Sequence, residues 1–133
     1  MPALRRRPRS LPEKDARDLR WLDLFGHLIG NTDRHFGNVS FLIDERGGLR
    51  LAPAYDMLPM ALAPSGDELV ARTPEVDPPG VANLDVWPDA ARWATRYWQA
   101  VGAEPTLETA VRAYADAAEA AIARIAARVA PAE

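Results

Sequence analysis

Residues 30–38 of this 133-residue chain read Gly30-Asn31-Thr32-Asp33-Arg34-His35-Phe36-Gly37-Asn38, and residues 52–56 read Ala52-Pro53-Ala54-Tyr55-Asp56. Together they supply an aspartate, an asparagine five residues later, and a second aspartate beyond a short insert. Enzymes that transfer phosphoryl groups use these residue types to orient an accepting hydroxyl and to hold Mg²⁺ through hard oxygen ligands. The pattern therefore predicts Asp33 as a catalytic aspartate, and Asn38 and Asp56 as magnesium ligands.

Each of these residues also has a simpler explanation. Asp33 can cap a turn and Asn38 can begin a strand, because aspartate and asparagine are common in loops. The simpler explanations suffice for single residues, whereas the joint pattern of residue types and spacings favours a site. Motif matches remain hypotheses until the structural context is known.

Composition and length restrict the class of protein. The chain is long enough for one domain and too short for a two-lobed kinase. Hydrophobic residues make up 48% and charged residues 26%, as in ordinary globular proteins. The chain has no cysteine, which excludes disulfides and thiolate metal sites and fits a cytoplasmic location. No apolar run indicates a signal peptide or a membrane span.

Residues 1–14 are rich in arginine and proline and are interpreted as a tail preceding a domain at 15–130. Arg5, Arg6, Arg7 and Arg9 precede the first acidic residue, Glu13. We interpret Arg5–Arg9 as a solvated tail rather than a nucleic-acid contact, since no aromatic residues interleave with the arginines.

Apolar periodicity predicts a buried helix over 16–29, with Asp15 as its N-cap and an end at Gly30-Asn31. Strands are expected at 39–44 and 49–52, joined by a glycine-containing turn near Arg46 and Gly47. The antiparallel register then places Asn38 opposite about residue 55, so that Asn38 and Asp56 meet at the open end of the hairpin. His27, on the first helix, is interpreted as a core residue without a functional role.

The remainder of the chain is expected to be irregular over 59–85 and helical beyond. One helix is predicted over 88–101, stopped by Gly102, with its three aromatic residues in the core: Trp93, Tyr97 and Trp98. A last amphipathic helix is predicted over 107–129, capped by Thr106. The fold class is therefore α+β and mainly helical, with one short β-hairpin carrying the predicted metal-site residues.

The segments 31–38 and 51–59 resemble the C-terminal region of HipA-family toxin kinases. The resemblance implies a kinase C-lobe-like helical subdomain. It also implies a serine/threonine protein kinase of a type II toxin–antitoxin system, using Mg²⁺ and ATP on a protein substrate and restrained by an antitoxin. Asp33 matches the catalytic aspartate, and Asn38 and Asp56 match the magnesium ligands. His35, Arg34 and Asn31 match positions that shape the catalytic loop. The element Asp33-Arg34-His35 with Asn38 is also similar to phosphoinositide-type kinases, but Pro53-Ala54-Tyr55-Asp56 favours HipA.

The chain departs from the family in lacking an N-terminal lobe. A working kinase needs a glycine-containing phosphate loop and a strand lysine that pairs with nucleotide phosphates. The single lysine, Lys14, lies in the arginine–proline segment, and Gly47-Gly48 lacks phosphate-loop spacing. Three explanations stay open: a truncated product, which we favour; the C-lobe of a split kinase with a separate N-lobe polypeptide; or a non-catalytic binding remnant that engages a kinase or antitoxin partner.

Overall fold

The computed structural model describes residues 11–31, 40–54, 57–62 and 73–129. It is mainly helical, with helices α1 (Glu13–Leu28), α2 (Trp87–Ala103) and α3 (Thr109–Val129). Strands β1 (Phe41–Ile43) and β2 (Leu49–Leu51) form an antiparallel hairpin, and two short 3₁₀ helices, η2 (Met60–Leu62) and η3 (Val81–Asn83), lie in the connections. The expected mainly helical α+β class is confirmed at this level.

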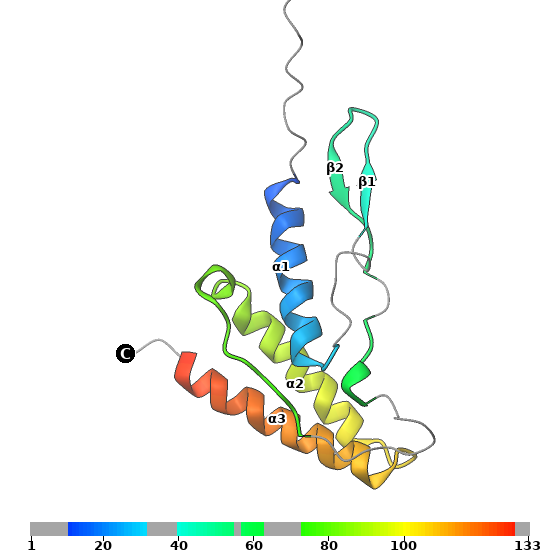
Figure 1. Cartoon of the computed structure of the whole chain (residues 1–133), viewed down its shortest axis with the longest axis vertical. Helices are drawn as coiled ribbons and strands as arrows, with labels where there is room; N and C mark the ends of the chain where they lie inside the picture. Colours follow the sequence, from blue (N-terminus) through cyan, green and yellow to red (C-terminus); the bar gives the residue numbers. More distant parts are fainter. Residues whose placement is uncertain (1–10, 32–39, 55–56, 63–72, 130–133) are drawn as a thin grey trace, which may run out of the picture.

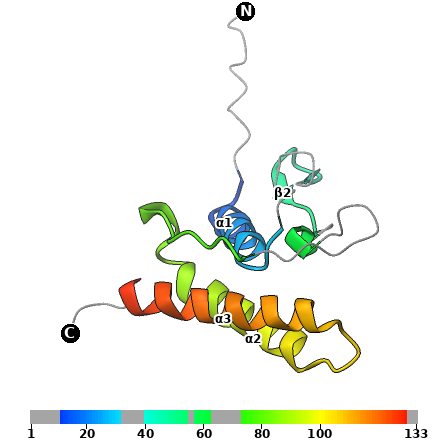
Figure 2. The ribbon, with the colours of Figure 1, turned by 60° about the horizontal axis from the view of Figure 1, so that its bottom comes forward.

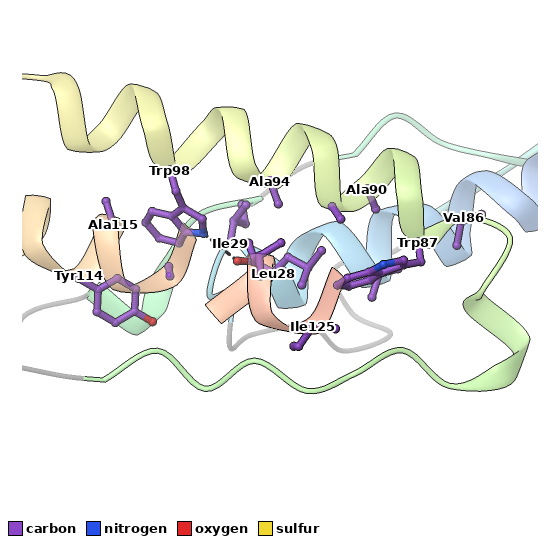
Figure 3. Packing of buried hydrophobic residues seen from close by; sticks show 14 residues of the cluster. Leu28, Ile29, Val86, Trp87, Ala90, Ala94, Trp98, Tyr114, Ala115 and Ile125 are labelled. Atoms are coloured by element: carbon purple, nitrogen blue, oxygen red, sulfur yellow. Dashed lines mark hydrogen bonds between the residues drawn. The ribbon is translucent and has the colours of Figure 1, made fainter. Parts of the chain in front are cut away.

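Helices α2 and α3 form an antiparallel pair, and α1 packs across α2 (Figures 1 and 2). The pair can approach closely because small residues line its interior; Ala90, Ala94, Ala115 and Ala118 are at most 1% exposed. Larger side chains from all three helices fill the space around these alanines. Figure 3 shows Trp98 of α2 between Leu28 and Ile29 of the α1 end and Tyr114 of α3.

Trp98 anchors α1 to α2. Its ring is 1% exposed, and its indole Nε1 donates a hydrogen bond to the Leu28 carbonyl at 2.9 Å. That carbonyl lies in the last turn of α1, where backbone oxygens have no partner within the helix. The indole therefore fills the core and satisfies a helix end at the same time.

Polar contacts hold the start of α2 against α1. Arg20 Nη1 and Nη2 donate to the two carboxylate oxygens of Asp85 at 2.6 and 3.0 Å, and Trp21 Nε1 donates to Asp89 at 2.9 Å. The hydrogen bond from Arg20 lowers the pKa of Asp85. Arg20 also donates to the Ala82 carbonyl, so η3 is fixed beside α1.

Several sequence predictions of helix ends were wrong. Asp15 does not cap α1; Pro12 occupies the N-cap and Asp15 lies inside the first turn, so the helix takes in two residues of the predicted tail. Gly102 does not stop α2, which continues to Ala103. Thr106 does not cap the last helix, because that helix begins at Thr109. The Thr106 hydroxyl instead donates a hydrogen bond to the Glu104 carboxylate.

Two predictions of burial also need correction. Trp93 was expected in the core, but it is 46% exposed and stacks beneath the Arg96 guanidinium at 5.0 Å. His27 is half-buried rather than a core residue, and its Nε2 accepts a hydrogen bond from the Asp77 backbone N–H at 2.9 Å. Among the helices in the described part of the chain, none is long and apolar enough to cross a membrane.

Candidate functional site

Most of the predicted site residues lie outside the described part of the chain. These are Asp33, Arg34, His35, Asn38 and Asp56. Their predicted roles, and the predicted meeting of Asn38 with Asp56, stay predictions. Asn31 is described, and so are the residues on which both site segments rest. The structure therefore shows how the protein holds the residues next to the segments that contain Asp33 and Asp56.

The end of α1 fixes the chain immediately before Asp33. Gly30 adopts φ +77°, and its N–H donates to the His27 carbonyl at 3.1 Å. The Asn31 N–H donates to the Gly26 carbonyl at 2.8 Å. This pair of bonds is a Schellman motif, which needs a left-handed residue and so favours glycine. Helix α1 thus stops at the position predicted from the sequence, and Asn31, 5% exposed, is held within the protein.

The segment that follows Asp56 docks on the same helix end. The Ala61 N–H in η2 donates to the Gly30 carbonyl at 2.9 Å, and the Asn31 side-chain amide contacts Met57 Sδ at 3.5 Å. A Cβ added to Gly30 would lie 3.2 Å from the Ala61 Cβ. Gly30 therefore permits the close approach of η2 to the end of α1. Asn31 and Met57, the described residues nearest in sequence to Asp33 and Asp56, are therefore in direct contact.

The hairpin between these segments is anchored to α1 by Asp15. Its carboxylate accepts hydrogen bonds from Arg50 Nε at 2.8 Å, from Arg50 Nη2 at 3.2 Å and from the Leu51 N–H at 2.8 Å. The Arg50 hydrogen bond, followed by that of Leu51, lowers the pKa of Asp15. A 4% exposed carboxylate is tolerated because it is paired and hydrogen-bonded. Asp15 therefore contacts the hairpin instead of capping α1 as expected from the sequence.

The hairpin turn forms as predicted. Strand residue Ile43 pairs with Leu49, and Phe41 pairs with Leu51, so the turn centres on Arg46. Gly47 adopts φ +79°, and the Asp44 carboxylate accepts hydrogen bonds from the backbone N–H groups of Arg46 and Gly48. The segment is therefore a tight hairpin turn closed by Asp44 and not a phosphate-binding loop.

A groove of about 390 Å³ lies between the first half of α1 and the hairpin. Its lining includes Trp21, Leu22 and Arg50, together with residues 52–54, which lead into the predicted ligand Asp56. Lys14 lines its rim, and the ammonium donates to Asp18 at 2.7 Å within α1. Lys14 is thus a helical surface residue, not part of an arginine–proline tail.

Within the described ranges, no group of three or more histidine, cysteine or acidic residues is arranged to hold a metal ion. The predicted magnesium ligands, Asn38 and Asp56, fall outside those ranges. The donor set that they offer, one amide oxygen and one carboxylate, matches the oxygen ligands that Mg²⁺ takes while keeping several waters.

Comparison with known proteins gives one family and one relative. A family model described as the HipA-like C-terminal domain matches residues 1–132. The chain is 37% identical over 90 residues to "Toxin YjjJ" of Escherichia coli (strain K12). That alignment covers 66% of this chain and 20% of the relative, so the chain spans about a fifth of that protein's length. No solved structure matches.

Proposed function

Because the chain belongs to the family of HipA-like C-terminal domains, we propose that it is the C-terminal catalytic portion of a HipA-like serine/threonine protein kinase. In this proposal Asp33 orients the accepting hydroxyl of a protein substrate and takes up its proton. Asn38 and Asp56 hold Mg²⁺, which when bound neutralises charge on the phosphoryl group donated by ATP. Arg34, His35 and Asn31 shape the loop around Asp33.

The observation that carries the proposal is the junction at the end of α1. Gly30 accepts a hydrogen bond from Ala61, and Asn31 contacts Met57. Asp33 follows Asn31 by two residues, and Asp56 directly precedes Met57. Phosphoryl transfer depends on holding the catalytic carboxylate and the metal ligands in one geometry. A partly buried junction between their two chain segments supports a shared site.

The proposed cellular setting is a toxin–antitoxin system of the cytoplasm. The relative that matches the chain is named a toxin, and this supports the assignment without identifying a substrate. The proposal also requires an N-terminal lobe, supplied by a longer chain or a separate polypeptide, because the 133 residues contain no phosphate loop and no strand lysine for ATP. The proposed partners are therefore an N-lobe, a protein substrate and an antitoxin.

The test reconstitutes phosphoryl transfer. The chain is mixed with the part of the E. coli relative that its alignment does not cover, and transfer of labelled phosphate from Mg-ATP to protein is measured. Asp33→Asn is expected to reduce transfer by at least about 100-fold, as for loss of a positioned general base. Asp116→Asn, an exposed substitution on α3, is the matched control and is expected to leave transfer unchanged.

Metal binding gives a second readout that needs no N-lobe. Mn²⁺ replaces Mg²⁺ as the probe, and its binding to the chain is followed by electron paramagnetic resonance. Asp56→Asn is expected to weaken Mn²⁺ binding about tenfold or more while the thermal unfolding midpoint stays unchanged. Transfer that survives Asp33→Asn, or Mn²⁺ binding that survives Asp56→Asn, contradicts the proposal and favours a binding module.

A further inference from the structure

Met57 lies at the contact between the two segments of the candidate site. In sequence it directly follows Asp56, the predicted magnesium ligand. Its Sδ accepts a hydrogen bond from the side-chain amide of Asn31 at 3.5 Å, and Asn31 is 5% exposed. A thioether sulfur is a weak hydrogen-bond acceptor. The contact next to Asp56 is therefore sensitive to a chemical change at a single atom.

The Met57 side chain is held on one side and accessible on another. It packs against the hydrophobic core cluster, as Ala61 and Leu62 of η2 also do. It is nevertheless only half-buried. Methionine that keeps some exposure is open to small oxidants, which convert its thioether to a sulfoxide. Met57 thus combines access for an oxidant with a fixed contact inside the protein.

The contact between Met57 Sδ and Asn31 Nδ2 leaves no room for an added atom. At 3.5 Å the two atoms are near the optimal separation of nonbonded heavy atoms, about 3.5–4.0 Å. An oxygen added to the sulfur on this side needs about 2.7–3.2 Å of its own to the amide nitrogen, so the sulfur has to retreat. An oxygen added on another side leaves an electron-poor sulfur in place of the acceptor. Both sulfoxide epimers therefore weaken the contact.

We propose that Met57 is a reversible oxidation site, and that its conversion to sulfoxide by a peroxide removes the anchor next to Asp56. One S–O bond forms as the O–O bond of hydrogen peroxide breaks, and the second oxygen leaves as water with both protons. The sulfur is oxidised by two electrons and the peroxide is reduced by two. Methionine sulfoxide reductases reverse the change. The inference rests on the proposed function, because it regulates the site in which Asp56 holds the metal.

Met60 offers a control from the same part of the chain. It lies three residues after Met57, at the start of η2, and is also half-buried. Among the described residues, it belongs neither to the core cluster nor to the side chains packed against that cluster. Oxidation of Met60 is therefore expected to leave the junction intact. Met1, the remaining methionine, is common to every variant below.

Hydrogen exchange tests the inference without a metal. The chain, Met57→Leu and Met60→Leu are treated with hydrogen peroxide, the peroxide is removed, and mass spectrometry measures oxidation at each methionine. The Ala61 N–H, which donates to the Gly30 carbonyl, is expected to exchange at least about tenfold faster after treatment of the chain and of Met60→Leu. Treatment is expected to leave its exchange unchanged in Met57→Leu, because leucine keeps the apolar volume without an oxidisable sulfur. Methionine sulfoxide reductases are expected to restore the original rate.

Two results of this experiment overturn the inference. One is unchanged Ala61 exchange in a chain whose Met57 is oxidised. The other is a Met57 that stays reduced while Met60 is oxidised.

Mn²⁺ binding tests whether the change reaches the metal ligand. Oxidation is expected to weaken Mn²⁺ binding about tenfold in the chain and in Met60→Leu, as for loss of a group that supports a metal ligand. Met57→Leu is expected to bind Mn²⁺ equally before and after treatment. Met57→Gln, which is polar and of similar length, is expected to weaken binding without peroxide, whereas Met60→Gln leaves it unchanged. Far-UV circular dichroism confirms that each variant keeps its helices.

The Mn²⁺ measurement separates this inference from the proposed function. Binding that is present in the untreated chain and unaffected by oxidation of Met57 overturns the regulation and leaves the proposed function standing. An untreated chain that binds no Mn²⁺ contradicts the proposed function instead. Exchange of the Ala61 N–H then still decides whether oxidation of Met57 opens the junction.

Discussion

Asp15 binds Arg50 across 35 positions of sequence, with its Oδ2 2.8 Å from the arginine Nε. The same oxygen accepts the Leu51 N–H at 2.8 Å. One carboxylate of α1 therefore fixes both a side chain and the outer backbone edge of β2.

This contact predicts that acid releases the hairpin. The hydrogen bonds of Arg50 and then Leu51 lower the pKa of Asp15 from its ordinary value of 3.8. A lowered pKa in the folded state means that the carboxylate stabilises the fold fully above about pH 3.8 and that this contribution is lost as the pH falls through the folded value. The amide resonance of Leu51 is expected to shift in that window below pH 3.8.

The control for the acid transition is Asp15→Asn, which keeps the shape of the side chain but does not titrate. This variant is expected to have a less stable hairpin at pH 7 and no further Leu51 shift on acidification. An acid shift that persists in Asp15→Asn assigns the transition to another carboxylate.

Gly30→Ala is expected to lower the free energy of unfolding by more than Gly47→Ala. Both glycines have a positive φ, which costs a residue with a Cβ about 1–2 kcal/mol. At Gly30 the new Cβ also meets the Ala61 Cβ at 3.2 Å, whereas nothing lies within 4 Å at Gly47. Urea denaturation of both variants measures the difference. Equal losses of unfolding free energy in the two variants would mean that the contact of the new Cβ with Ala61 in η2 costs no stability.

Trp98→Phe is expected to destabilise the protein by about 2–4 kcal/mol, from the lost core volume and the Leu28 carbonyl left without its donor. Trp93→Phe is the matched control, because Trp93 is 46% exposed and such surface changes usually stay within about 0.5 kcal/mol. Thermal unfolding followed by circular dichroism compares the two. A loss at Trp93 as large as that at Trp98 contradicts the assignment of the core.

Gly102→Ala is expected to stabilise the protein by about 0.5–1 kcal/mol, since glycine is unfavourable inside a helix. The added Cβ would lie 2.8 Å from Asp116 Oδ1, but that atom ends an exposed side chain that can rotate away. Repeating the change in an Asp116→Ala background isolates the contact. If Gly102→Ala lowers stability in the otherwise unmodified chain but not in the Asp116→Ala variant, the Asp116 side chain is held in place.

Local patterns predicted the elements of the fold better than their ends. The hairpin was predicted because its strand residues and glycine turn act over a few positions. The end of α1 was predicted because Gly30 supplies the left-handed residue that a Schellman motif needs. Gly102 was misjudged, because packing of α2 on α3 outweighs the roughly 1 kcal/mol that glycine costs inside a helix.

Long-range contacts were the source of the other errors. An aspartate at a helix start looks the same in sequence whether it caps the helix or reaches a strand, and only the position of Arg50 decides for Asp15. Trp93 directly precedes Ala94, which is buried. Successive residues of a helix are rotated by about 100° around its axis, so the Trp93 side chain points away from the buried face. For the candidate site, the sequence predicts chemical groups that lie outside the described residues. The junction of Asn31 with Met57 joins positions 26 apart and carried no sequence signal.

The separation of contacts along the chain has a consequence for biosynthesis. Leu28 and Trp98 are 70 positions apart, and Trp21 and Asp89 are 68 apart. A ribosome adds roughly 5–20 residues per second, so α1 waits roughly 4–14 s for the helix that covers it. During that time its apolar side chains are available to chaperones and to other nascent chains. The yield of folded protein should therefore depend on translation speed and chaperone supply more than the small size of the chain suggests.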